Sequence, residues 1–279
     1  MIDKVRAYGK VNIGLHVVKK KKNGYHLLDM IMSEIDLFDE IEFYECDTIK
    51  VDMSPTICEE KDNLCYKVAN YIKEKYSISK GIKIVIKKSI PSGAGLGGGS
   101  SDAAAVLKFL NKYWDLKLST RCLKKIGAIF GKDIPYFLCG GLARVRGEGE
   151  KVSKIKKKLK EKPIALIVPK EKISTKVVFN NFTNFKKSRI KELLKALKEE
   201  RMQKSVFNDL TSTTNSLTSG LIESVKGKLN EFNIGSTMTG TGTVVVAFCK
   251  GDIEEFKRDV VSAVGNDEKI EIVFTKLKF

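Results

Sequence analysis

The chain has 279 residues, of which 42% are hydrophobic and 30% charged, and Lys and Arg outnumber Asp and Glu by 51 to 34. This length and composition predict one or two globular domains with a sizeable core, and they exclude a disordered or collagen-like chain. No apolar run approaches the roughly 18 residues that a membrane-spanning helix needs. The net charge of +17 comes mostly from scattered lysines, which favours a solvated surface over a nucleic-acid or membrane contact.

The six cysteines show no C-x-x-C spacing, and neither histidine lies near a pair of them. A zinc site is therefore not expected, and we predict no metal ion bound by the protein alone. Because no secretion signal precedes the first patterned segment, we expect free thiols in a reducing cytoplasm.

Alternating polar and apolar residues predict several strands in the N-terminal half. The first covers 10–18 and is followed by a polar turn at 19–24. Further strands are predicted around 41–43 and over 82–87, just before a glycine-rich segment.

This glycine-rich loop covers 91–101 and leads into a helix that we expect to begin at Asp102. The helix carries an apolar stripe at helical spacing. Ser119 is the expected N-cap of a second helix, which ends near Gly131 and leads into a loop at 132–135.

The C-terminal half begins with a charged connector at 151–162 and a buried strand at 164–168. The remaining predicted elements are helices over 188–203, 220–229 and 252–264 and strands over 243–249 and 269–274. This alternation predicts an α+β sandwich of the ferredoxin-like type.

The glycine-rich loop has the properties of a phosphate cradle. Glycine lets the backbone approach a ligand, and the following helix offers free N–H groups and the positive end of its dipole. A merely tight or flexible connection is the alternative. A P-loop is excluded because no glycine is followed by Lys and then Ser or Thr. A protein kinase is excluded because H-R-D and D-F-G are absent.

A dinucleotide fingerprint is matched literally by Gly93, Gly95 and Gly98. That motif requires a strand after the helix, with an acidic residue at its end. Here a second helix is predicted instead, so the context does not fit.

The segment PSGAGLGGGSS at 91–101 resembles the ATP-binding signature of the GHMP kinases. Its GGGSS core resembles the branch of that superfamily that phosphorylates a cytidine diphospho-alcohol. Four further segments agree with this branch: AYGKVNI at 7–13, NGYH at 23–26, GKDIP at 131–135 and MTGTG at 238–242. The five matches occur in order, so the resemblance covers nearly the whole chain.

The resemblance implies an α+β, two-domain GHMP kinase fold. Residues 1–155 would form an ATP-binding domain like ribosomal protein S5 domain 2, and residues 156–279 a ferredoxin-like domain. It also implies ATP with Mg²⁺ as phosphate donor, a cytidine diphospho-alcohol of non-mevalonate isoprenoid synthesis as acceptor, and a cytoplasmic monomer or weak homodimer without nucleic-acid or membrane partners.

The same resemblance assigns the catalytic residues. Asp133 is the candidate base, and Lys10 would keep its carboxylate ionised and steady the transferred phosphoryl group. From the sequence alone, the default interpretation of Asp133 is a turn or cap residue, and that of Lys10 is one of many surface lysines. The implied ATP-binding residues are Pro91, Ser92, Gly93, Ala94, Gly95, Leu96, Gly97, Gly98, Gly99, Ser100 and Ser101.

Two of these loop residues have a second possible role. The hydroxyls of Ser100 and Ser101 could bind phosphate or Mg²⁺, or they could cap the helix. Asp102 is expected to interact with the helix dipole rather than to act as a base.

The implied substrate-binding residues are Asn12, Tyr25, His26, Thr175 and Phe179. Tyr25 would stack on the cytosine and His26 would bond to the edge of the base. Phe179 could instead belong to the core, and His16 is expected to be structural.

Three alternative functions remain open at this point. One is a GHMP kinase acting on another small alcohol, such as mevalonate or homoserine. The second is a basic RNA-binding protein, for which a steep salt dependence would be expected. The third is an inactive homologue, although Lys10 and Asp133 are both present.

Overall fold

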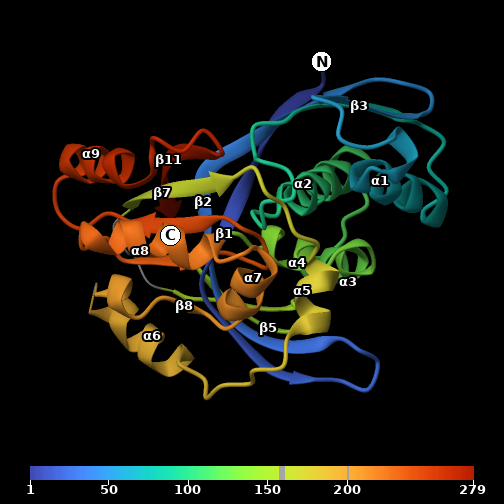
Figure 1. Cartoon of the computed structure of the whole chain (residues 1–279). Coiled ribbons are helices and arrows are strands. Elements are labelled where there is room, and N and C mark those ends of the chain that lie inside the picture. The colour runs from blue at the N-terminus through green and yellow to red at the C-terminus, as the bar shows by residue number, and fades with distance from the viewer. Residues whose placement is uncertain (157–160, 200) are drawn as a thin grey trace.

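The computed structural model describes residues 1–156, 161–199 and 201–279. Two long antiparallel strands, β1 (Asp3–Lys20) and β2 (His26–Tyr44), run the length of the molecule (Figure 1). The strands predicted at 10–18 and 41–43 are parts of this hairpin. It extends further than predicted because no proline and only two glycines, both in β1, interrupt its strands.

The described residues form one sheet of eleven strands around this hairpin. Along its main path the order is β3 (Ile49–Ser54), β4 (Ile82–Lys87), β2, β11 (Ile270–Lys278), β7 (Lys162–Pro169), β10 (Val245–Phe248) and β9 (Ser236–Met238). Off this path, β5 (Ala143–Gly147) pairs with β2, and the short β8 (Phe207–Asn208) runs parallel to β1. The strands predicted at 82–87, 164–168, 243–249 and 269–274 are all present, and β11 is longer than predicted.

The prediction of a charged connector at 151–162 is partly wrong. Lys151–Lys154 forms strand β6, which pairs antiparallel with β5 so that Val152 lies opposite Val145. This one apolar pair anchors an otherwise charged edge strand. Residues 157–160 of the predicted connector lie outside the described residues.

Both halves of the chain contribute to the sheet. The end of β11 pairs with β2, placing Leu277 opposite Ile35. One buried cluster contains Val11 and Ile13 from β1 together with Leu166 from β7 and other C-terminal residues. The boundary between residues 155 and 156 stays a prediction, while the sheet itself is continuous across the two halves.

Four helices pack on the N-terminal half, on the right in Figure 1. They are α1 (Leu64–Lys75), α2 (Gly98–Tyr113), α3 (Thr120–Phe130) and α4 (Ile134–Phe137). The predicted cap of α3 is confirmed, because the Ser119 side chain accepts a hydrogen bond from the Cys122 N–H. The predicted start of α2 at Asp102 is wrong. The helix begins at Gly98 because Gly97, at φ +74°, turns the chain directly into it.

The C-terminal helices are α5 (Thr175–Asn181), α6 (Ile190–Lys198), α7 (Thr211–Leu217), α8 (Leu221–Glu231) and α9 (Ile253–Val264). The helix predicted at 188–203 is too long, since α6 ends at Lys198 and a short 3-10 turn (Met202–Lys204) follows. A second 3-10 turn (Glu60–Asp62) precedes α1.

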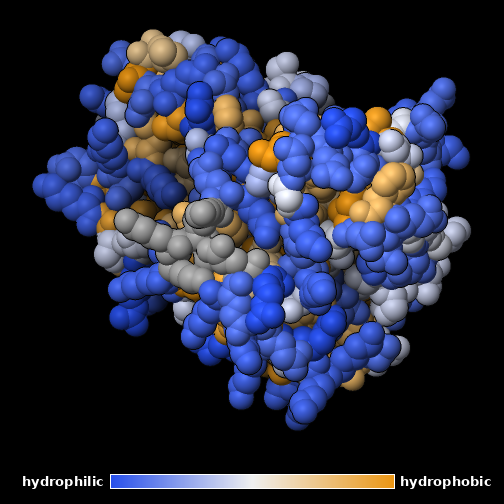
Figure 2. Space-filling view, turned by 90° about the vertical axis from the view of Figure 1, so that its left-hand side faces the viewer, coloured by the Kyte–Doolittle hydropathy of each residue, from blue (hydrophilic) through white to orange (hydrophobic). Residues whose placement is uncertain are grey.

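The outer surface agrees with the composition. The face in Figure 2 is mostly hydrophilic, with hydrophobic residues confined to small patches. Among the described residues, no helix combines the length and apolar character required to cross a bilayer.

Candidate active site

The glycine-rich loop between β4 and α2 alternates between the core and an open cleft. Ala94 and Leu96 are buried in an apolar cluster. Gly95 and Gly97, both with φ above +70°, line the cleft. The Leu96 carbonyl accepts a hydrogen bond of 2.9 Å from the Lys10 N–H. The loop is therefore attached to β1 next to the candidate catalytic lysine.

A second glycine loop, 238–242, packs against the first, backbone to backbone. A Cβ atom on Gly95 would lie 2.9 Å from the Thr239 carbonyl oxygen. Asn12 joins this loop to β1. Its N–H donates to the Thr239 hydroxyl at 2.8 Å, and the Gly240 N–H donates to its side-chain oxygen at 3.1 Å. The two glycine motifs and the first strand thus form one surface of the cleft.

The start of α2 presents hydrogen-bond donors suited to phosphate. The first intrahelical bond of this turn runs from the Ser101 N–H to the Gly97 carbonyl. The N–H groups of Gly98, Gly99 and Ser100 therefore have no acceptor within the helix. These donors and the positive end of a 16-residue helix fit a polyphosphate.

The two serines of the loop have different positions. Ser100 lines the cleft, whereas the Ser101 hydroxyl donates to the Tyr8 carbonyl at 2.7 Å and is buried away from it. The N-cap is Gly97, so the alternative of N-capping by either serine is wrong.

Lys10 is buried and aimed into the cleft. Its ammonium group donates a hydrogen bond of 2.8 Å to the Asn12 side-chain oxygen. Burial lowers the pKa of Lys10, and the negative charge of Asp133 partly opposes this shift. Lys10 is thus a desolvated cation with a carboxylate in its vicinity, and not a surface lysine.

Asp133 lies at the start of α4 and also lines the cleft. Its side chain makes no capping hydrogen bond to this helix within the described chain. Asp133 therefore occupies the N-cap position without capping the helix through its side chain, and its carboxylate lies in the vicinity of Lys10. Between β1 and α4, the fold brings together two residues that are far apart in the sequence.

An aromatic group forms the other end of the cleft. His26 is buried, and its ring stacks on Phe179 of α5 with centroids 5.0 Å apart. Burial, together with the charge of Lys20, lowers the pKa of His26. Its Nε2 atom is buried and has no hydrogen-bond partner among the described residues. His26 is thus a buried imidazole, enclosed by aromatic rings at this end of the cleft.

Tyr25 differs from His26 because 54% of it is exposed. Its ring is covered on one side by the Lys132 ammonium, 5.7 Å from the centroid. From the later half of the chain, the Thr175 hydroxyl lies 2.8 Å from the Thr241 hydroxyl. Phe179 packs against the core and lines the cleft as well.

The cleft has a volume of about 970 Å³ and collects most of the predicted residues. Predicted residues that line it are Lys10, Asn12, Tyr25, His26, Gly95, Gly97, Ser100, Asp133, Thr175 and Phe179. Predicted residues outside its lining are Pro91, Ser92, Gly93, Ala94, Leu96, Gly98, Gly99 and Ser101. Of this second group, Ala94 and Leu96 are buried, and Gly98, Gly99 and Ser101 belong to the first turn of α2.

Several lining residues were not predicted. Gly240 and Thr241 lie in the MTGTG motif, so the sequence carried a signal for them. Lys132 and Glu148 form a charge network that includes Lys21, with distances of 3.1 Å and 2.6 Å from the two lysines to Glu148. For Glu148 no sequence motif gave a signal.

His16 is structural, as expected. Its Nδ1 atom lies 2.7 Å from an Asp209 carboxylate oxygen, which also accepts a hydrogen bond from the Val17 N–H. The described residues contain no cluster of three His, Cys, Asp or Glu side chains that could hold a metal ion.

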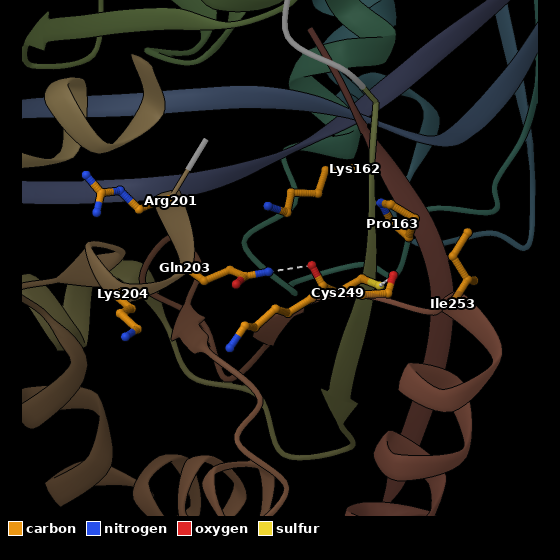
Figure 3. A pocket seen from close by; sticks show the side chains of 9 residues that line it. Lys162, Pro163, Arg201, Gln203, Lys204, Cys249 and Ile253 are labelled. Carbon is orange, nitrogen blue, oxygen red and sulfur yellow. Dashed lines mark hydrogen bonds between the residues drawn. The ribbon is translucent and has the colours of Figure 1, made fainter. Parts of the chain in front are cut away.

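A second cavity, of about 600 Å³, lies between the starts of β7 and α9 (Figure 3). It is basic, with Lys162, Arg201 and Lys204 among its lining residues, and the Gln203 amide donates to the Cys249 carbonyl across it. The part of the chain that the structure describes places no carboxylate in this lining. Without a base this cavity cannot activate an alcohol, which favours the cleft as the active site.

Comparison with known proteins agrees with this arrangement. Residues 63–141 match the family described as "GHMP kinases N terminal domain". A 4-diphosphocytidyl-2-C-methyl-D-erythritol kinase from Clostridium beijerinckii is 45% identical over 184 residues, which are 64% of each chain. This alignment spans less than two thirds of that relative. An enzyme of the same name from Alkaliphilus oremlandii is 36% identical over 255 residues, 88% of this chain and 87% of the relative.

Solved structures show the same fold. A crystal structure of a 4-(cytidine 5'-diphospho)-2C-methyl-D-erythritol kinase matches with a TM-score of 0.84 and 26% identity, covering 99% of this chain and 100% of the other. A homoserine kinase from Cytophaga hutchinsonii matches with a TM-score of 0.72 and 16% identity, covering 100% and 96%. The second likeness concerns the fold alone.

Proposed function

Because the chain belongs to the GHMP kinases, within the family of the 4-diphosphocytidyl-2-C-methyl-D-erythritol kinases, we propose that it phosphorylates the 2-hydroxyl of that cytidine diphospho-alcohol with ATP. The observation that carries this proposal is the single cleft that holds both ends of the reaction. Lys10 and Asp133 lie beside the glycine loop, and the aromatic group around His26 lies at the other end.

The mechanism assigns the proton to Asp133. Its carboxylate accepts the proton of the acceptor hydroxyl as that oxygen bonds to the γ-phosphorus, and the bond to the β-phosphate oxygen breaks to leave ADP. Lys10 stabilises the charge on the transferred group, and its burial strengthens this interaction. The amides at the start of α2 hold the remaining phosphates.

Mg²⁺ would neutralise the phosphate charge. It usually binds one or two protein oxygens together with phosphates and water, so it needs no preformed cage. Among the oxygen donors that line the cleft, the Ser100 hydroxyl fits this role, which leaves the Asp133 carboxylate to accept the proton.

The aromatic end gives the specificity for cytidine. Tyr25 offers an exposed ring face for stacking, and His26 lines the same end of the cleft. This arrangement favours a nucleoside over mevalonate or homoserine, neither of which has a ring to stack.

The proposal extends to the organisation and setting of the enzyme. We assign residues 1–155 to an ATP-binding domain like ribosomal protein S5 domain 2 and residues 156–279 to a ferredoxin-like domain. The enzyme would work in non-mevalonate isoprenoid synthesis as a cytoplasmic monomer or weak homodimer, without nucleic-acid or membrane partners.

Release of ADP tests the proposal. The full chain is incubated with ATP, Mg²⁺ and 4-diphosphocytidyl-2-C-methyl-D-erythritol, and in parallel with mevalonate and with homoserine. We expect turnover with the cytidine substrate alone. Turnover confined to another alcohol would overturn the substrate assignment, and no turnover with any of them would overturn the kinase assignment.

A further inference from the structure

A buried cluster of charges lies beneath the glycine loop, outside the residues that line the cleft. The Lys88 ammonium lies 2.5 Å from Asp39 on β2 and 2.7 Å from Asp102 on α2. The exposed fraction of each of the three side chains is below one tenth. Removing three charged groups from water costs free energy. The cluster is therefore expected to have a role other than keeping the surface soluble.

The two carboxylates hold opposite ends of the loop. Asp39 accepts hydrogen bonds from the Ser89 and Ile90 N–H groups at 2.6 Å and 2.8 Å, immediately before the loop begins. Asp102 belongs to the helix that follows the loop. Lys88 connects them and lies below the first residue of that helix, with its Nζ 3.1 Å from the position of a Cβ atom on Gly98.

We propose that Lys88 is a positioning residue that fixes both ends of the glycine loop, and thereby sets the affinity for the phosphates of ATP without contacting them. This inference rests on the proposed function of the loop. A loop whose ends are fixed keeps its N–H groups aimed at the ligand and loses less entropy on binding.

The surroundings of Asp102 agree with a tightly enclosed cluster. Its Oδ1 atom is buried without a hydrogen-bond partner among the described residues, and burial raises its pKa to about 7. From α1, the Cys65 thiol faces the same cluster, and burial raises the pKa of that thiol well above its ordinary value. Lys88 is thus the cation at the centre of a cluster formed by β2, α2 and α1.

The test measures ATP binding by calorimetry for the wild type and Lys88→Met. We expect the Kd for ATP to rise by about tenfold or more, with kcat at saturating ATP and the KM for the acceptor alcohol nearly unchanged. Lys87→Met is the matched control, because Lys87 also pairs with a carboxylate of β2, Glu42, but at the surface. It should bind ATP like the wild type.

A double variant separates positioning from stability. Lys88→Met leaves two buried carboxylates unpaired, and Lys88→Met with Asp102→Asn removes one of these charges. We expect the double variant to regain thermal stability but not ATP affinity. If the single variant does not fold, ATP binding is measured on the double variant instead. A Lys88 variant that binds ATP as tightly as the wild type would overturn this inference and leave the proposed function unaffected. A wild type that binds no ATP would overturn the proposed function as well.

Discussion

Among the described residues that line the cleft, Asp133 and Glu148 carry carboxylates, and their different partners support the proposed choice of Asp133 as the base. Glu148 accepts a hydrogen bond from Lys21 and is paired with Lys132, and these contacts lower its pKa. A carboxylate so stabilised is a poor proton acceptor. Asp133 makes no capping bond, so its carboxylate is available to the acceptor hydroxyl.

Replacing Asp133 with Asn removes the proton acceptor and keeps the shape of the side chain. We expect kcat to fall by about 10²- to 10⁴-fold, because this is the typical contribution of a general base. The Kd for ATP should change little. Steady-state kinetics and calorimetry check both values, and Asp115→Asn, at an exposed surface ion pair, is the control. Turnover near that of the wild type would remove Asp133 from its role.

The ring of Tyr25 is expected to contribute stacking and little else. Tyr25→Ala should raise the KM for the cytidine substrate by about tenfold or more, because stacking on an aromatic ring is worth roughly 1–3 kcal/mol per base. Tyr25→Phe keeps the ring face and should behave like the wild type. A higher KM for ATP, with the KM for the cytidine substrate unchanged, would assign the two ends of the cleft in reverse.

At this scale the sequence was most informative where a residue lies in a local motif. Lys10, Tyr25 and Asp133 could be found in this way, and all three line the cleft. The different orientations of Ser100 and Ser101 could not, because they depend on the turn of α2 and on the carbonyl of Tyr8. Glu148 could not be found either, since only folding brings it to Lys21 and Lys132.

Among the structural elements, the two glycine loops depend on each other. Gly95 has a φ of +73°, and a side chain there would meet the backbone of Thr239. Glycine is therefore required at this position twice, for its conformation and for the close approach of the second loop.

Gly95→Ala and Gly220→Ala separate these two effects. Both glycines have positive φ values, but a Cβ atom on Gly220 would meet no atom within 4 Å. Gly220→Ala should cost only the conformational term, about 1–2 kcal/mol. Gly95→Ala should cost more and should also weaken ATP binding. Urea unfolding and calorimetry measure both, and equal losses of stability would contradict the packing of the loops.

Patterning predicted most elements but not their ends. The early start of α2 depends on Gly97 adopting a positive φ. A glycine allows this conformation, but its presence in the sequence does not predict it. Strand β6 was missed because its lysines suggest a connector, and its pairing with β5 becomes visible only in the fold.

For the whole molecule, Asp102 links stability to pH. Folding raises its pKa from 3.8 to about 7, so between these pH values the folded protein keeps a proton that the unfolded chain releases. The stability that depends on this proton is present below pH 4 and is lost as the pH rises to 7. The loss can reach about 1.4 kcal/mol per pH unit.

Asp102→Asn should abolish this dependence. Relative to the variant, the wild-type free energy of unfolding should fall between about pH 4 and pH 7, as urea unfolding over that range would measure. Asp52→Asn, at an exposed ion pair with Lys83, should show no such trend relative to the wild type. A constant difference between the wild type and Asp102→Asn would show that Asp102 keeps an ordinary pKa.

The general architecture was predictable from the sequence, because its motifs occur in the order typical of a known family. The strand pairing that connects the two halves of the chain was not predictable. The pairing of Leu277 with Ile35 is a contact between strands very distant in sequence, and no local pattern encodes it. The same holds for the approach of the second glycine loop to Asn12.

The long hairpin has a consequence for how catalysis can be organised. Strand β1 carries Lys10 and Asn12, and β2 begins with His26. The proposed phosphate and cytosine ends of the cleft thus both take residues from one hairpin, whose strands pair with others of the same sheet. Because Lys10, Asn12 and His26 keep fixed places along this hairpin, a substrate of another length would meet a different set of residues from β1 and β2.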